Sequence, residues 1–286
     1  NEEPSDSYLD VVPQENVRCT FQSNGSKVDM RYTFANGKLR MIHVFEGAGS
    51  PRLTKTALNT LESAKDFLDS YQNYSGNSFY GELKSMLSNV DVGKNVTETS
   101  RNIKLEVTVS EDLETETYKW TYAYDGVEAS AKCVALGYKS GVLKYFLDNW
   151  GLYKIGSTSV NISEEAAIDI AMQRASTFSW NMGTDDNMAK IMNFTVANAM
   201  VWETVFFSNR YADQPRSQDP LTLYPIRHVW VSLDKFYPGN VYGINVYVWA
   251  DTGEVCYIHE RVSTLDPLPE LVADDSDFTV EAVNNQ

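Results

Sequence analysis

Alternation of apolar and polar positions dominates this chain and predicts strands. Between residues 17 and 46, three alternating runs are separated by turns at 23–26 and 35–38, and each turn contains Asn-Gly. Asn-Gly supplies the positive-φ residues that tight hairpins require. We therefore expect a three-stranded meander whose apolar face must be covered.

Helical periodicity follows and is expected to provide that cover. Apolar residues recur at three- and four-residue steps after Thr54, a candidate cap, until Gly76, and a second, shorter run covers 79–90. Alternation resumes after Gly93. It predicts strands at 103–109, 118–124, 127–135 and 143–147.

A second unit is expected to begin at Ser163. Ser163 suits a helix N-cap, and the carboxylates of Glu164 and Glu165 favour the positive end of the helix dipole. After a polar loop at 208–220, strands are predicted at 228–233, 241–250 and 254–262.

The two halves follow a similar plan, in which a helix and an irregular stretch precede a strand with a central Trp. These are Trp120 and Trp230, each followed by a longer strand, a Gly turn and a closing aromatic strand. We interpret the halves as two copies of one supersecondary unit.

The second half resembles a PepSY domain. The matching segments are the helix start SEEAAIDIA (163–171), the strand HVWVSL (228–233) and the hairpin VYVWADTGEV (246–255). The first half is similar only in outline, with YKSGV (138–142) in place of the turn and two helices where one is expected. Through YFLDNW (145–150) and LDKFYPGNV (233–241), the whole chain also resembles uncharacterised secreted or membrane-tethered archaeal proteins that carry such modules.

This resemblance implies an α+β fold of two PepSY-like modules, each an antiparallel sheet covered by one or two helices. It also implies non-catalytic binding or peptidase regulation, since it carries over no catalytic residue. The expected organisation is an acidic N-terminal segment (1–16), a first module (17–158), a second module (159–263) and an acidic C-terminal segment (264–286).

The net charge of −15 is concentrated at the two ends. Residues 1–16 hold five acids and residues 263–286 hold six, with no Lys or Arg in either, so the ends carry 11 of the 15 negative charges. The body has no basic stripe to displace counterions from phosphates, and nucleic acid is not an expected partner.

The acidic ends are expected to be solvated linkers or, alternatively, strands that add to an open sheet edge of another copy. The strand-addition candidates are Tyr8, Leu9, Val11, Val12, Phe278, Val280 and Ala282. Head-to-tail addition would give a filament or a ring. Tails that pack on their own domain are the other possibility.

Several features favour an extracellular or cell-surface glycoprotein. Asn-x-Ser/Thr sequons occur at Asn24, Asn73, Asn95, Asn161 and Asn193. The chain starts with Asn rather than Met, which suggests a processed precursor or a trimmed chain. No apolar run approaches the roughly 20 residues of a membrane span, although the precursor could have been anchored.

Histidines and cysteines offer little chemistry in the sequence. His43, His228 and His259 lie in separate strand runs without metal-binding spacing, so we expect structural histidines and no metal or cofactor. The three cysteines allow at most one disulfide and are expected to be buried strand residues. They are Cys19, Cys133 and Cys256.

Other candidates are weaker still. Ser50 lacks the Gly-x-Ser-x-Gly elbow of a hydrolase nucleophile. Asp274, Asp275 and Asp277 could offer oxygens to calcium, but the Gly and distal Glu of a calcium-binding loop are missing. The 17 Tyr and 6 Trp could form a glycan-stacking face, although packing in the core is the default for such residues.

Together these features predict a secreted or cell-surface, non-enzymatic protein that binds another protein. The partner would be a second copy or another envelope protein, and terminal strand addition could build an extracellular polymer. The alternatives are a PepSY-type peptidase-binding regulator and a carbohydrate-binding surface protein.

Overall fold

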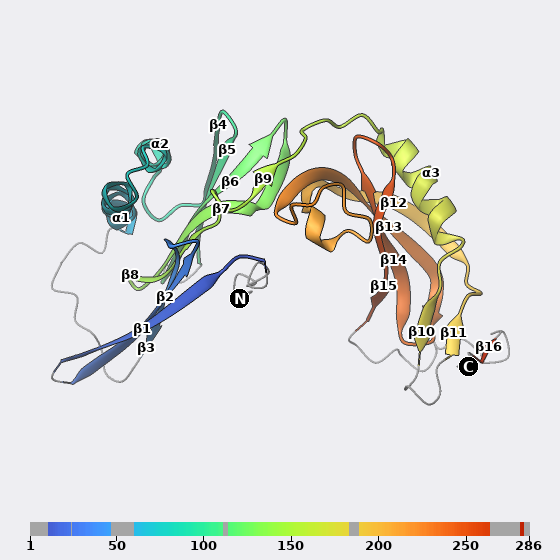
Figure 1. Cartoon of the computed structure of the whole chain (residues 1–286), viewed down its shortest axis with the longest axis horizontal. Helices are drawn as coiled ribbons and strands as arrows, with labels where there is room; N and C mark the ends of the chain where they lie inside the picture. Colours follow the sequence, from blue (N-terminus) through green and yellow to red (C-terminus); the bar gives the residue numbers. More distant parts are fainter. Residues whose placement is uncertain are drawn as a thin grey trace. The chain divides into compact units, whose positions relative to one another are not determined.

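The computed structural model describes residues 11–23, 25–46, 60–110, 114–182, 189–263 and 281–282. The chain divides into two compact units, Asn1–Lys154 (unit 1) and Ile155–Gln286 (unit 2), each with a hydrophobic core of its own (Figure 1).

Unit 1 is an antiparallel arrangement of strands in the spatial order β1-β2-β3-β8-β7-β6-β5-β4. The strands are β1 (Gln14–Ser23), β2 (Ser26–Ala35), β3 (Lys38–Glu46), β4 (Val96–Ser100), β5 (Ile103–Val109), β6 (Thr115–Tyr124), β7 (Val127–Lys139) and β8 (Val142–Asp148). At Asn36-Gly37 and Asp125-Gly126 both turn residues have positive φ, as the hairpin prediction requires. The predicted meander is confirmed.

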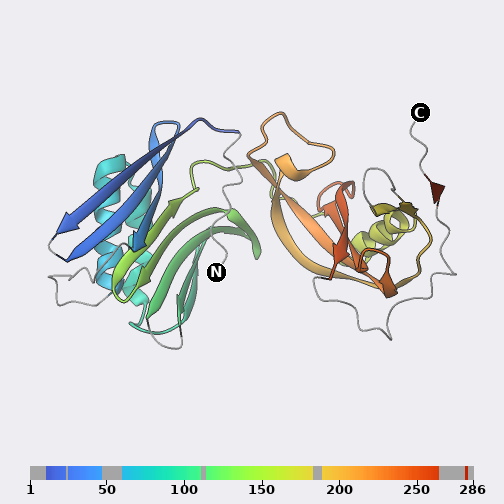
Figure 2. The same cartoon turned by 90° about the horizontal axis from the view of Figure 1, so that it is seen from below.

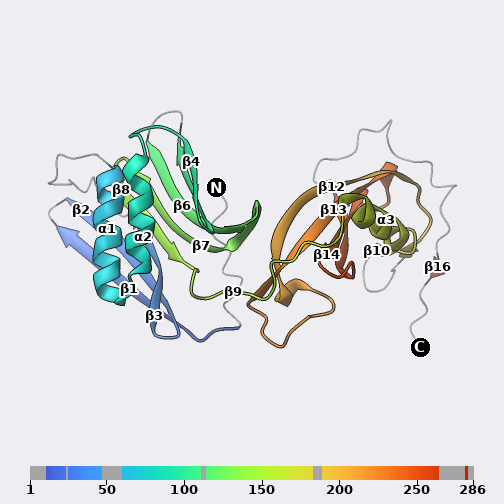
Figure 3. The ribbon, with the colours of Figure 1, turned by 90° about the horizontal axis from the view of Figure 1, so that it is seen from above.

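Two helices, α1 (Thr60–Ser75) and α2 (Phe79–Met86), lie side by side over one face of these strands (Figure 3). The short 3-10 helix η1 (Leu87–Asn89) follows α2. Figure 2 shows the strands in front of α1 and α2. Ile42 of β3 shares its core with Leu68 of α1, so the predicted helical cover is confirmed. Thr54 lies outside the described residues.

Unit 2 contains a second antiparallel series in the order β12-β13-β14-β15. These strands are β12 (Val196–Ser208), β13 (Thr222–Tyr237), β14 (Val241–Trp249) and β15 (Val255–Val262), with the 3-10 helix η2 (Asn209–Tyr211) after β12. A small sheet has the order β10-β11-β16, formed by β10 (Trp180–Met182), β11 (Ala189–Ile191) and β16 (Glu281–Ala282). The short strand β9 (Lys154–Ile155) lies where the two units join in sequence.

Helix α3 (Glu164–Ala175) packs on β12, β13 and β14. The Ser163 hydroxyl accepts a hydrogen bond from the backbone N–H of Ala166 at 3.2 Å, which confirms the predicted cap. Ala167, Ala171 and Ala175 are fully buried, and their small side chains let the helix approach the strands closely.

The prediction of an α+β fold built from two PepSY-like modules is wrong. Strands account for 54% of the described residues and helices for 18%, so β structure predominates. The stretch after α3 had been expected to be irregular, but residues 196–208 form β12, and β13 extends well beyond 228–233. Two register shifts in β12 break its period-two alternation, which hides the strand from pattern analysis.

The two central tryptophans do not occupy equivalent places. Trp120 is fully buried in the core beneath α1 and α2. In β13, Val229 and Val231 pack in the core with α3, so Trp230 between them faces the opposite side of the strands. The matched Trp spacing therefore does not reflect matched packing.

Candidate functional site

The face of the unit 2 strands turned away from α3 gathers both aromatic and titratable side chains. We call this side, which carries His228 and Trp230 of β13, the distal face. A bulge in β12 contributes two of its residues. Val201 pairs with Val229 and Glu203 with His228, so Trp202 is the extra residue between them. Trp202 contacts Trp230, and Glu203 contacts His228, so both side chains reach the distal face.

Arg261 of β15 lies among three aromatic rings. Its guanidinium carbon is 5.4 Å from the ring centre of Trp202, 5.6 Å from that of Trp230 and 5.7 Å from that of Tyr242. These four residues form what we call the Arg261 cluster. Within the described part of the chain, the guanidinium of Arg261 makes no hydrogen bond and no ion pair. Its N–H donors therefore lack a protein acceptor there, although the rings stabilise its charge.

Gly243 of β14 makes room for this cluster. A Cβ at position 243 would lie 2.7 Å from Trp230 Nε1 and 3.1 Å from the backbone oxygen of Val231. Because Arg261 pairs directly with Gly243, the arginine side chain meets the indole where β14 has no side chain. Trp202 closes the cluster from β12, with its ring 5.7 Å from that of Trp230 and 52% of its surface exposed.

Beside the Arg261 cluster, one residue from each of the four strands forms a hydrogen-bonded row. Glu203 Oε1 lies 3.2 Å from His228 Nδ1, and His228 Nε2 lies 3.1 Å from Asn245 Oδ1. Asn245 Nδ2 lies 3.0 Å from His259 Nε2. We call these residues the polar row.

The row runs across all four strands through direct side-chain contacts. A carboxylate only accepts hydrogen bonds, so in the first contact His228 Nδ1–H donates to Glu203. The contacts of His228 with Asn245 and of Asn245 with His259 continue the row to β15.

Aromatic rings enclose the polar row. Tyr247 stacks on His228 with ring centres 4.4 Å apart and planes at 7°, and Tyr257 lies 5.0 Å from His259. Burial lowers the pKa of His259. The charge of Glu260 opposes this effect, and the nearby His228 and Arg261 reinforce it. His259 Nδ1 is buried and has no hydrogen-bond partner among the described residues.

Sequence reasoning missed most of this face. It singled out His228 and His259 but treated them as unrelated, because the strand register that brings them together cannot be read from the chain. His43 lies in β3 of unit 1. Over the described ranges, no group of three or more His, Cys, Asp or Glu side chains is placed to hold a metal ion.

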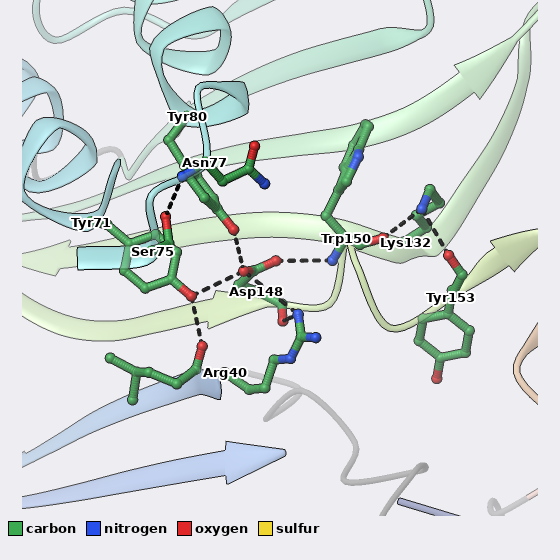
Figure 4. Close-up of polar contacts among 10 residues, drawn as sticks. Arg40, Tyr71, Ser75, Asn77, Tyr80, Lys132, Asp148, Trp150 and Tyr153 are labelled. Atoms are coloured by element: carbon green, nitrogen blue, oxygen red, sulfur yellow. Dashed lines mark hydrogen bonds and ion pairs between the residues drawn. The ribbon is translucent and has the colours of Figure 1, made fainter. Parts of the chain in front are cut away.

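Unit 1 contains a second polar cluster, centred on the buried Asp148 at the end of β8 (Figure 4). Tyr80 OH donates to Asp148 Oδ2 at 2.6 Å, and Tyr71 OH lies 3.1 Å from the same oxygen. The backbone N–H of Trp150 donates to Oδ1 at 3.0 Å, and Arg40 Nη1 lies 3.7 Å from Oδ2. Burial and the adjacent Asp148 charge raise the pKa of both tyrosines.

Lys132 fixes the turn that follows Asp148. Its amine donates to the backbone oxygens of Trp150, at 2.5 Å, and Tyr153, at 2.8 Å (Figure 4). Burial lowers the pKa of Lys132 to about 8. Because the Asp148 carboxylate and the Lys132 amine find their partners inside the unit, we interpret the Asp148 cluster as structural.

The described sequons are all exposed. Asn73 lies in the last turn of α1, and Asn95 and Asn193 precede strands. Asn161 Nδ2 donates to the Asp251 backbone oxygen at 3.3 Å. Asn24 lies outside the described residues. Glycosylation itself stays a prediction.

The strand-addition candidates are only partly described. Val12 is buried, Val11 is partly buried, and Ala282 of β16 pairs with Ala189 of β11 in the same chain. This intrachain pairing matches the alternative in which a tail packs on its own domain. The candidates Tyr8, Leu9, Phe278 and Val280 lie outside the described residues.

Among the remaining candidates, the cysteines are free thiols. Burial raises the pKa of Cys133 to about 11 and that of Cys256 to about 12, which makes both thiols poor nucleophiles. Ser50, Asp274, Asp275 and Asp277 lie outside the described residues.

Comparison with known proteins gives little further guidance. No family model matches the chain. No curated protein matches it. It is similar to a solved structure described as the Bacillus megaterium YpeB C-terminal domain, with 10% identity and a TM-score of 0.26 over 89% of this chain and 92% of that one. At that TM-score, neither fold nor function is carried across. None of the helices in the described ranges has the length and apolar character needed to cross a membrane.

Proposed function

We propose that this protein is a non-enzymatic binding protein of the extracellular space or cell surface, and that it recognises another protein chain through the distal face of unit 2. One observation carries the proposal. The Arg261 cluster combines a guanidinium that has no acid partner among the described residues with an exposed tryptophan. Tryptophan and arginine are the residues that most often dominate the binding energy of protein interfaces.

The surroundings of the cluster support a protein ligand. Met200, directly opposite Trp230 in β12, is 45% exposed and extends the apolar area next to Trp202. Burying these side chains would supply apolar contact, while Arg261 and Glu203 would set orientation through charge. The extracellular location rests on the sequons.

Carbohydrate binding is a second candidate, favoured by the exposed Trp202 ring and by the polar groups of Asn245 and His259 on the same face. The PepSY-type peptidase regulator rests on the sequence resemblance alone.

A displayed library of random 12-residue peptides, selected on the full chain, tests the proposal. We expect enriched peptides whose binding falls roughly 30-fold or more when Trp202 is replaced by Ala, as for an interface hot spot. The matched control is Tyr74→Ala, because Tyr74 is 59% exposed but lies on α1 of unit 1. Selection of no peptide, or of peptides that bind W202A as well as the unmodified chain, would reject a peptide-binding distal face.

A further inference from the structure

The chemistry of the Arg261 cluster defines the group that it would bind. A guanidinium presents N–H donors in a planar fork that matches the two oxygens of a carboxylate. The rings of Trp202, Trp230 and Tyr242 around it favour an apolar or aromatic group next to that carboxylate. The cluster therefore suits an acidic peptide with apolar residues beside its acids.

The chain itself carries a segment of this kind. Residues 1–10 read NEEPSDSYLD, with four acids and no Lys or Arg, and Tyr8-Leu9 stands directly before Asp10. The described chain begins at Val11, and Val12 is already buried in unit 1. Fully extended, ten residues would span about 33 Å.

We infer that the Arg261 cluster receives a carboxylate of the acidic segment 1–10 from a second copy of this chain. This inference rests on the proposed function and names the partner of the same surface. The charges are complementary, since an arginine without a described acid partner meets a segment with four acids. The C-terminal acidic segment is the poorer occupant, because its Glu281 and Ala282 pair with β11 of their own chain.

Head-to-tail contact of this type predicts open-ended association, because each copy offers one donor segment and one Arg261 cluster. Association should weaken with salt, since charge pairs at a surface are screened.

A complementation experiment with full-length chains tests the inference. The acceptor-deficient variant is R261Q, and the donor-deficient variant carries E2Q, E3Q, D6N and D10N. The control is R101Q, since Arg101 is an exposed arginine of unit 1. In sedimentation velocity, the unmodified chain and R101Q should associate as concentration rises. Each deficient variant should associate about 10- to 100-fold more weakly, the loss expected for a charged hydrogen-bonded pair.

The mixture of the two deficient variants gives the sharpest result. R261Q still has a donor segment and the quadruple variant still has an acceptor, so together they should form a heterodimer that grows no further. Circular dichroism should show that both variants remain folded.

Three results would overturn the inference. The first is an R261Q variant that associates as strongly as the unmodified chain. That result would overturn the inference about segment 1–10 but would not contradict peptide binding by the distal face. In the second, the quadruple variant binds labelled peptide 1–10, whereas the unmodified chain stays monomeric and does not bind the peptide. That result would mean that segment 1–10 occupies the Arg261 cluster of its own chain. A monomeric unmodified chain, together with no binding of the peptide by the quadruple variant, would exclude this ligand altogether.

Discussion

Asp148 is a buried acid of unit 1 that faces the buried Arg40. Arg40 and Asp148 are almost fully buried, with side chains 8% and 2% exposed, and two tyrosine hydroxyls converge on the same carboxylate. The Asp148→Asn substitution would leave Arg40 as a buried charge without its counter-ion. We expect a loss of about 3–5 kcal/mol in the free energy of unfolding, measured by urea denaturation.

The matched control for this prediction is Asp91→Asn. Asp91 pairs with Lys94 at 2.8 Å, but both side chains are about 70% exposed, and pairs of that kind contribute about 0–1 kcal/mol. Equal costs for the two substitutions would show that Asp148 does not balance the charge of Arg40.

At the scale of strands and helices, Ala substitutions at two glycines test two different effects on stability. Gly243 tests close packing between strands, and Gly81 tests helix propensity. Gly243→Ala would drive a methyl group against Trp230 Nε1 and the Val231 backbone oxygen, and we expect a cost of about 1–3 kcal/mol. At Gly81, inside α2, the nearest obstacle is the end of the flexible Gln72 side chain. Gly81→Ala should therefore stabilise the protein by about 0.5–1 kcal/mol.

Thermal unfolding of both variants, with near-ultraviolet circular dichroism to follow the tryptophans, checks this pair. Gly243→Ala should also change the tryptophan signal, because Trp230 must move away from Arg261. A stabilising G243A would mean that the strands adjust without cost and that Gly243 does not position the cluster.

Local signals in the sequence predicted elements better than they predicted the fold. Asn36-Gly37 fixed a hairpin and Ser163 fixed a helix start, because in both cases neighbouring residues determine the backbone. The strand β12 was missed because its bulge puts Trp202 and Glu203 on one face, against the alternation that identifies a strand. Without β12, the chain seemed to have a more even balance of helix and sheet than it has.

The candidate site could not be predicted from the sequence, for a related reason. Arg261 meets Trp202, Trp230 and Tyr242 only because four strands pair in one register, and Gly243 gives no sign in the sequence that an indole lies over it. A cluster drawn from β12 to β15 depends on pairings between distant segments, whereas a cap or a turn depends on adjacent residues.

For the molecule as a whole, the sequons give a direct test of the extracellular proposal. An attached glycan must extend into solvent from the Asn side-chain nitrogen. Asn73 is exposed in the last turn of α1, whereas Asn161 donates that same nitrogen to the Asp251 backbone oxygen. We therefore expect modification at Asn73 in protein from its native source, with Asn161 the less favourable position.

Intact mass spectrometry should then give a mass above 32.3 kDa by glycan increments, and glycan release should return it to that value. In a proteolytic digest, the peptide with Asn73 should carry the glycan, and the peptide with Asn161 serves as the internal control. The order of the two sites matters because it depends on the fold, whereas the sequon alone makes them equivalent. Native protein at the unmodified mass would remove the main support for an extracellular location. It would leave the Arg261 cluster untouched, since that cluster depends only on the packing of unit 2.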